Sequence, residues 1–212
     1  MKHRLLLRLC TALSLTLLSL SALALDRTKI ADDAADVTPL LIGQTAPNST
    51  LKTVDGAPVS LKALTMEKPT VLIFYRGGWC PYCNRQLAGL KDIENQLDEL
   101  GYQILAISPE TPEQLQTQKL QEKFTVRLLS DASLSAITGF GIGFYVADET
   151  TERYKTKGNI ELNQDNSGKA VLPAPAVFIL NKNAKVKFSF VNPDFKERLS
   201  PELLLSAAKL VL

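Results

Sequence analysis

The chain has 212 residues, 45% of them hydrophobic and 22% charged, which suits one globular domain with a substantial core. Its formal charge of +2 depends on three basic residues near the N-terminus, Lys2, Arg4 and Arg8. The remaining 21 basic residues face 22 acidic ones, and without a basic stripe we expect neither nucleic acid nor an anionic membrane as a partner.

The first 24 residues have the three parts of a secretory signal peptide. The basic start precedes an apolar stretch at residues 9–20, and Ala22-Leu23-Ala24 is a small-x-small cleavage site. We expect cleavage after Ala24 and a secreted protein, located in the periplasm if the source is Gram-negative. An uncleaved anchor is the alternative, but the apolar stretch is shorter than the ~20 residues of a membrane span.

Cleavage would remove Cys10 and His3, the only histidine, and leave Cys80 and Cys83 as the only cysteines. A chain without histidine cannot use Ser-His or Cys-His catalysis. Two cysteines alone cannot complete a four-coordinate zinc site, so we expect no metal and no cofactor.

The first predicted elements lead to a central strand. Residues 25–42 carry three acids without a clear period, and we expect a flexible lead-in. The domain, residues 43–212, is expected to start with a β-hairpin whose strands, 50–54 and 59–61, flank an Asp-Gly turn. The unbroken apolar run at 70–75 predicts a strand that is covered on both faces.

Apolar residues spaced by three or four predict that one helix follows and ends at Gly101. These residues are Leu87, Leu90, Ile93, Leu97 and Leu100. Next come a buried strand at 102–108, a polar helix at 112–124, a short strand at 126–129 and a short helix at 133–138. This order of strands and helices predicts a right-handed parallel unit.

The C-terminal part predicts an antiparallel hairpin of strands 176–180 and 185–191, followed by a helix over 201–212 that Ser200 caps. The polar residues 144–172 can be placed only as an inserted loop or loose hairpin. They form either a lid or partner surface, or a tolerated insertion. The predicted fold class is α/β, with a central mixed sheet flanked by helices.

The motif Cys80-Pro81-Tyr82-Cys83 follows the central strand and begins a helix. Pro81 suits the first helical position, so Cys80 is expected at the cap, where unpaired N–H groups and the helix dipole favour a thiolate. Cys83 follows one turn later, so the two sulfurs can close a reversible disulfide. A structural disulfide and a metal knuckle are alternatives, but the closed loop is short and further ligands are lacking.

Two other residues of the turn are candidate supporting groups. Arg76 can lower the pKa of a thiol or meet an anionic partner, or it can be a solvated loop residue. Trp79 can shield the sulfur and offer a contact surface, or it can simply pack in the core.

Several segments resemble the alkyl hydroperoxide reductase and thiol-specific antioxidant (AhpC/TSA) branch of the thioredoxin superfamily. They are residues 43–47, 55–61 and 175–180, and the CxxC after the apolar strand. Two segments are similar, more narrowly, to peroxiredoxin-like proteins that carry a thioredoxin-type CxxC. They are Arg76-Gly77-Gly78-Trp79 with the CxxC, and Asn192-Pro193-Asp194-Phe195 with Arg198. The resemblance spans residues 43–212 and implies a thioredoxin-like fold with a redox function.

The chain departs from both parent patterns. By resemblance to peroxiredoxins, Cys83 stands at the place of the peroxide-reactive cysteine, but Arg76 and Cys80 replace the neighbouring proline and threonine. Pro175 replaces the arginine that polarises the peroxide. By resemblance to thioredoxins, Pro175 is expected to follow a cis bond beside the CxxC, with a trans proline at a strand start as the alternative. Phe74 occupies the place of the buried acid of thioredoxins.

These observations lead to three hypotheses. In the first, the protein is a thiol-disulfide oxidoreductase in which Cys80 attacks and Cys83 resolves. In the second, it is a thiol-dependent hydroperoxide reductase in which Cys83 is oxidised and Cys80 resolves. In the third, it is a secreted binding module with an idle disulfide. Both enzymes need a thiol or disulfide protein partner or a hydroperoxide substrate, and a recycling protein.

Overall fold

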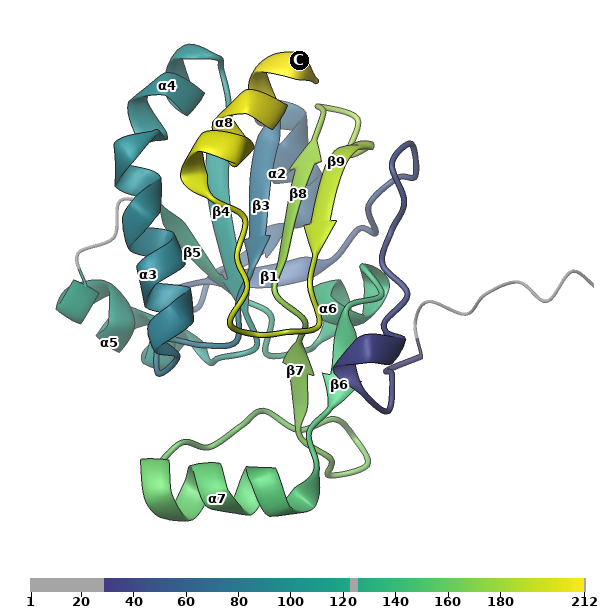
Figure 1. Cartoon of the computed structure of the whole chain (residues 1–212), viewed down its shortest axis with the longest axis vertical. Helices are drawn as coiled ribbons and strands as arrows, with labels where there is room; N and C mark the ends of the chain where they lie inside the picture. The colour runs from purple at the N-terminus through teal and green to yellow at the C-terminus, as the bar shows by residue number, and fades with distance from the viewer. Residues whose placement is uncertain (1–28, 123–125, 212) are drawn as a thin grey trace, which may run out of the picture.

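The computed structural model describes residues 29–122 and 126–211 (Figure 1). The predicted leader, residues 1–24, and its cleavage site lie outside the described residues. Within the described ranges, the helices are too short or too polar to cross a bilayer.

One mixed sheet of seven strands, in the order β2-β1-β5-β4-β3-β8-β9, forms the centre of the molecule. The interior strand β3 (Thr70–Phe74) is the predicted apolar run, and all five residues are buried. It pairs in parallel with β4 (Gln103–Ser108) and antiparallel with β8 (Ala176–Leu180). The predicted parallel unit is therefore confirmed.

The outer strands complete the mixed sheet. β5 (Arg127–Ser130) lies parallel to β4, and β9 (Val186–Val191) forms the predicted late hairpin with β8. β1 (Thr50–Thr53) and β2 (Pro58–Ser60) form the predicted N-terminal hairpin, and β1 pairs antiparallel with β5. The predicted α/β class with a central mixed sheet is confirmed.

Helices cover both faces of this sheet (Figure 1). The described helices are α2 (Leu61–Glu67), α3 (Pro81–Gly89), α4 (Glu94–Glu99), α5 (Pro112–Glu122), α6 (Ser135–Gly139), α7 (Asp148–Gly158) and α8 (Pro201–Leu210). Ser200 caps α8 as predicted, since its side chain accepts a hydrogen bond from the Leu203 N–H.

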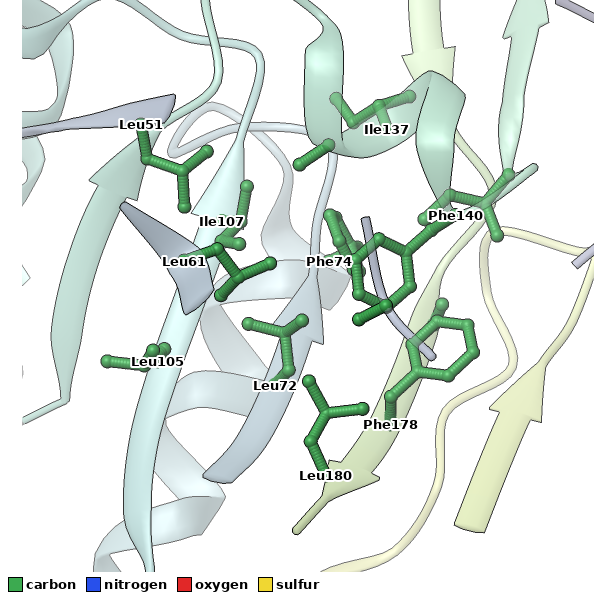
Figure 2. Close-up of a cluster of buried hydrophobic side chains, with 14 of the residues drawn as sticks. Leu51, Leu61, Leu72, Phe74, Leu105, Ile107, Ile137, Phe140, Phe178 and Leu180 are labelled. Atoms are coloured by element: carbon green, nitrogen blue, oxygen red, sulfur yellow. The ribbon is translucent and has the colours of Figure 1, made fainter. Parts of the chain in front are cut away.

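Strand alternation divides the core into two clusters. On one face, Leu72 and Phe74 of β3 pack with residues of α2 and α6, and Phe74, Phe140 and Phe178 form a group of aromatic rings (Figure 2). On the other face, Val71 and Ile73 pack with residues of α3, α4 and α8. Both cysteines belong to this second cluster.

The predicted long helix is interrupted, so that expectation is wrong in detail. A 3₁₀ turn, η3 (Leu90–Asp92), separates α3 from α4. Gly89, at the end of α3, lies against Pro201 of α8, and a Cβ added to Gly89 would lie 3.3 Å from the proline ring. Because a 3₁₀ turn keeps residues three apart on one face, Leu87, Leu90 and Ile93 all remain buried.

The described part of the lead-in is attached to the domain and is not the flexible segment we expected. Ala31 donates to the Gly143 carbonyl at 3.0 Å and accepts from the Tyr145 N–H at 2.9 Å. Thr38 and Leu40 donate to the carbonyl groups of Gly141 and Phe140. These backbone hydrogen bonds hold the lead-in against the strand that follows α6. A sequence without periodicity cannot reveal them.

The inserted segment contains more structure than a loop. β6 (Gly143–Tyr145) and β7 (Val171–Pro173) form a two-stranded antiparallel ribbon, and α7 lies between them in the chain. In Figure 1, this helix lies below the sheet, at the end of the molecule where α3 begins. The insertion is therefore an ordered unit close to the cysteine motif.

Candidate active site

Cys80 and Cys83 lie at the junction of β3 and α3, as the sequence predicts. Cys80 is the N-cap of α3 and Pro81 is its first residue. The Cys83 and Asn84 N–H groups donate to the Cys80 carbonyl oxygen at 3.0 Å and 3.1 Å. Both cysteines are free thiols, and they are only 1% and 0% exposed.

The two thiols differ in acidity. The hydrogen bond with the Cys83 thiol, above all, lowers the pKa of Cys80 to about 6, against the opposing effect of burial. The backbone N–H of Cys83 also lowers the pKa of Cys80. Its geometry is not that of a regular N-cap hydrogen bond to the Cys80 sulfur. Burial, the bond with Cys80 and the charge of Cys80 all raise the pKa of Cys83. The arrangement therefore presents a Cys80 thiolate that accepts a hydrogen bond from a Cys83 thiol.

Two guanidinium groups lie around this pair. Arg198 Nη2 donates to Cys83 Sγ at 3.5 Å, and both Arg76 and Arg198 lower the pKa of Cys80. The Arg76 backbone N–H also lowers the pKa of Cys83 through a hydrogen bond. By resemblance to peroxiredoxins, Pro175 stands where an arginine is expected, and no second arginine was expected at Cys83 from the sequence. Arg198, from the segment between β9 and α8, supplies a guanidinium at Cys83 instead.

Arg76 is buried among aromatic rings. Its guanidinium carbon lies 4.4 Å from the Phe195 ring centroid, 5.0 Å from that of Trp79 and 5.7 Å from that of Tyr154. Nη2 donates to the Tyr154 hydroxyl at 2.7 Å. At 6% exposure, Arg76 is not the solvated loop residue that sequence analysis allowed as an alternative. Because Tyr154 belongs to α7 and Phe195 to the C-terminal segment, Arg76 connects both segments to the cysteine turn.

Trp79 is half-buried and packs both on the cluster that holds the cysteines and on a small cluster within the insertion. Its ring centroid lies 5.1 Å from that of Tyr154. On the α3 side, the Tyr82 ring lies 5.8 Å from that of Phe195 in an edge-on contact. The surroundings of the thiols thus come from three separate parts of the chain.

A carboxyl group that sequence analysis missed lies under the cysteine turn. Glu110, two residues beyond β4, accepts a hydrogen bond from the Gly78 N–H at 2.8 Å and one from Ser108 Oγ at 3.3 Å. Burial raises its pKa to about 7. The parallel strands β3 and β4 end at the same edge of the sheet, and this was the signal that could have found Glu110.

The expected cis bond before Pro175 is absent, because all peptide bonds in the described ranges are trans. Pro175 is buried at the start of β8, and its carbonyl accepts from the Asn192 N–H at 3.2 Å. Ala176 pairs with Phe74 at the end of β3, so Pro175 lies across from the start of the cysteine turn. The pairing of β8 with β3 is regular with a trans bond before Pro175. A trans proline at a strand start was the alternative to the expected cis bond.

Among the described residues there is no cluster of three or more histidine, cysteine or acidic side chains that could hold a metal ion. The site therefore consists of two thiols, two guanidinium groups, one carboxyl group and the aromatic rings around them.

The family model described as AhpC/TSA matches residues 42–189. Over 104 residues, the chain is 34% identical to the putative peroxiredoxin bcp of Haemophilus influenzae and 32% identical to the peroxiredoxin Bcp of Escherichia coli K12. Each match covers 49% of this chain and 66% of the relative, just under two thirds of the relative's length.

Solved structures agree on the fold. The peroxidoxin BcpB of Mycobacterium tuberculosis superimposes with a TM-score of 0.63 and 19% identity, covering 81% of this chain and 97% of its own. Reduced Prx3 of Vibrio vulnificus has a TM-score of 0.66 and 18% identity, covering 80% of this chain and 99% of its own. Both likenesses support the predicted thioredoxin-like fold, which is confirmed.

Proposed function

Because the chain belongs to the AhpC/TSA family, we propose that it is a thiol-dependent oxidoreductase that reduces a disulfide of its substrate, with Cys80 attacking and Cys83 resolving. The observation that carries the proposal is the opposite shift of the two thiol pKa values, with that of Cys80 lowered to about 6 and that of Cys83 raised. A thiolate is the nucleophile in disulfide exchange, and at neutral pH this pair holds one thiolate and one protonated thiol.

The reaction proceeds in two exchanges. The Cys80 thiolate attacks one sulfur of the substrate disulfide, forms a mixed disulfide and expels the other sulfur as a thiolate. Cys83 then loses its proton, attacks the Cys80 sulfur, and releases the second substrate thiol. The substrate gains two electrons and the Cys80–Cys83 pair becomes a disulfide, which a separate thiol protein must reduce.

A second candidate function is hydroperoxide reduction through Cys83. Two observations favour it, the Arg198 guanidinium at Cys83 Sγ and the peroxiredoxin names of the relatives. The Cys83 thiolate would take the terminal oxygen of the peroxide, become a sulfenic acid and release an alcohol or water. Cys80 would then condense with it and release water. The raised pKa of Cys83 argues for the first candidate.

The proposed compartment lies outside the cytoplasm and rests on the leader-like sequence of residues 1–24 alone. Such a compartment maintains protein disulfides, which are the proposed substrate class.

Single-cysteine variants test the assignment. Cys83→Ser should accumulate a mixed disulfide with an oxidised protein substrate, because the attacking sulfur of Cys80 remains, the serine hydroxyl can still donate a hydrogen bond to it, and the resolving thiol is gone. Cys80→Ser should accumulate none above background. Mass spectrometry of the trapped adducts, after rapid alkylation of free thiols, identifies the linked cysteine.

The same variants, treated with hydroperoxide and a dimedone-type probe, test the second candidate. Rapid sulfenate labelling of Cys83 in the Cys80→Ser variant, without mixed disulfide at Cys80, would replace the first candidate by the second. Rapid labelling of Cys80 in the Cys83→Ser variant would keep the attacking role of Cys80 but change its substrate to a hydroperoxide.

A further inference from the structure

The Glu110 carboxyl group lies against the backbone of the turn that carries Cys80. Its Oε2 accepts from the Gly78 N–H at 2.8 Å, two residues before Cys80, while Ser108 Oγ donates to the same oxygen at 3.3 Å. Ser130 Oγ donates to the Glu110 backbone carbonyl at 2.6 Å and fixes the main chain at this position. Glu110 is therefore held from β4 and β5 and points at the cysteine turn.

The glycine pair of the motif makes this approach possible. A Cβ added to Gly77 would lie 2.9 Å from the Glu110 carboxyl carbon and 2.3 Å from Trp79 Nε1. A Cβ added to Gly78 would lie 2.8 Å from the side chain of Gln118. Gly77 also has a φ of +153°, in the region that favours glycine. The two glycines thus leave space beneath the turn for the side chains of Glu110, which follows β4, and Gln118 of α5.

A polar network continues from this contact. Asn84 Nδ2 donates to the Gly78 carbonyl at 2.7 Å, and Gln118 Nε2 donates to Asn84 Oδ1 at 3.1 Å. The Tyr75 hydroxyl donates to Gln118 Oε1 at 2.9 Å. Both polar groups of the Gly78 backbone are therefore satisfied by side chains, one of which can ionise.

Two ionisable groups interact with the Glu110 carboxyl, and a third lines the groove beside it. Tyr75, directly after β3, has a pKa raised by burial and then by the charge of Glu110. Cys80 approaches from the turn, and its charge contributes to the raised pKa of Glu110. Glu161, from the segment after α7, lines the same 310 Å³ groove. That groove is lined by described residues that include no lysine or arginine, and the α5 residues in it, Gln114, Thr117 and Gln118, are uncharged.

We propose that Glu110 is a positioning residue for the thiol pair, which holds the cysteine turn through the Gly78 amide and opposes the Cys80 thiolate when it ionises. The proposal rests on the proposed role of Cys80 as the attacking thiolate. As the pH rises through the pKa of Glu110, its negative charge makes ionisation of Cys80 harder, so the two groups titrate as a coupled pair. The titration of Cys80 therefore extends over a wider pH range than the titration of an isolated thiol.

Glu110→Gln tests this inference, since the amide oxygen can still accept from Gly78 while the charge is lost. The probe is the rate of iodoacetamide alkylation of Cys80 in the Cys83→Ser background between pH 4 and 9. We expect the profile of Glu110→Gln to narrow to a single titration and its midpoint to shift downward by up to about 0.5 pH unit, because Cys80 has the lower pKa of the two and ionises largely before Glu110 does. The matched control is Glu161→Gln, which removes an exposed acid from the same groove and should leave the profile unchanged. A Glu110→Gln profile that superimposes on that of the parent would overturn the inference.

A second measurement does not depend on the folding of that variant. In the otherwise unchanged chain with ¹³C-labelled glutamate, the Glu110 carboxyl should titrate near neutral pH, and Cys80→Ser should move this titration downward because it removes the opposing thiolate. A Glu110 titration that does not respond to Cys80→Ser would contradict the coupling. Because alkylation and carboxyl titration need no disulfide substrate, they remain interpretable even if the trapping experiment gives no mixed disulfide.

Discussion

The Arg198 guanidinium is shared between a sulfur and the main chain. Nη2 donates to Cys83 Sγ, while Nη1 donates to the carbonyl oxygens of Phe195 and Glu197. One side chain thus ties the C-terminal segment to the thiol pair and places a positive charge beside it. An arginine suits this position because its planar group can donate in several directions at once.

Replacing Arg198 should change the titration of the thiols. In Arg198→Ala, the midpoint of the Cys80 alkylation profile should rise by about 0.5 to 1 pH unit, because a cation that favours the thiolate is lost. Arg85→Ala is the matched control, since Arg85 is exposed on α3 and lies over the Tyr82 ring. An unchanged midpoint in Arg198→Ala would show that this guanidinium does not act on the thiols.

The residues of the site differ in how visible they are in the sequence. Cys80 and Cys83 are apparent because their spacing, the proline between them and the strand before them are all local signals. Arg198 lies 115 residues from Cys83, and only folding brings the two together. Glu110 can be recognised as a candidate only when β3 and β4 are known to end side by side.

At the scale of elements, α7 shows why the insertion was not recognised as helical. None of its residues is fully buried, so the apolar stripe that usually marks a helix is absent. The remaining signal is electrostatic, with Asp148 and Glu149 in the first turn and Lys155 and Lys157 in the last, an order that suits the helix dipole. β3, β4 and β8 were predictable, in contrast, because their apolar runs are continuous and bounded.

One contact between the insertion and the cysteine turn is Tyr154, which packs on Trp79 and accepts a hydrogen bond from Arg76. Since the thiols are almost fully covered, a protein substrate reaches Cys80 only when some covering segment moves. Tyr154→Ala should ease this movement. An aromatic pair contributes about 0.5 to 1.5 kcal/mol, which corresponds to a two- to tenfold increase in the rate of Cys80 labelling by a bulky maleimide.

This rate should be measured at a pH where Cys80 is fully ionised, so that access and not acidity is compared. Lys155→Ala, an exposed change on the same helix, serves as the control. Equal labelling rates for Tyr154→Ala and the unmodified chain would mean that α7 does not restrict access to the thiol.

At the scale of the whole molecule, a buried acid gives the fold a dependence on pH. Asp131, between β5 and α6, accepts from the Ile137 N–H at 2.8 Å and from the hydroxyls of Ser133 and Ser135. Burial outweighs these bonds and raises its pKa from 3.8 to about 6. The folded chain therefore binds this proton more tightly than the unfolded chain does.

The free energy of unfolding should consequently fall as the pH rises from about 4 to about 6, by an amount on the order of 2 to 3 kcal/mol from Asp131. Glu110, whose pKa is also raised, contributes in the same direction up to about pH 7. Urea unfolding of Asp131→Asn across this range should show a flatter pH dependence. Asp165→Asn, at an acid whose pKa is lowered, should keep the original slope. A slope that persists in Asp131→Asn would assign the effect to other groups.

Trp79 is the only tryptophan of the chain, and it lies next to Cys80, beneath Arg76 and against Tyr154. All indole fluorescence of the protein therefore originates within the turn that carries the thiols. The molecule contains its own optical reporter, because a sulfur that changes oxidation state, or a helix that moves away from the indole, alters the surroundings of the single emitter.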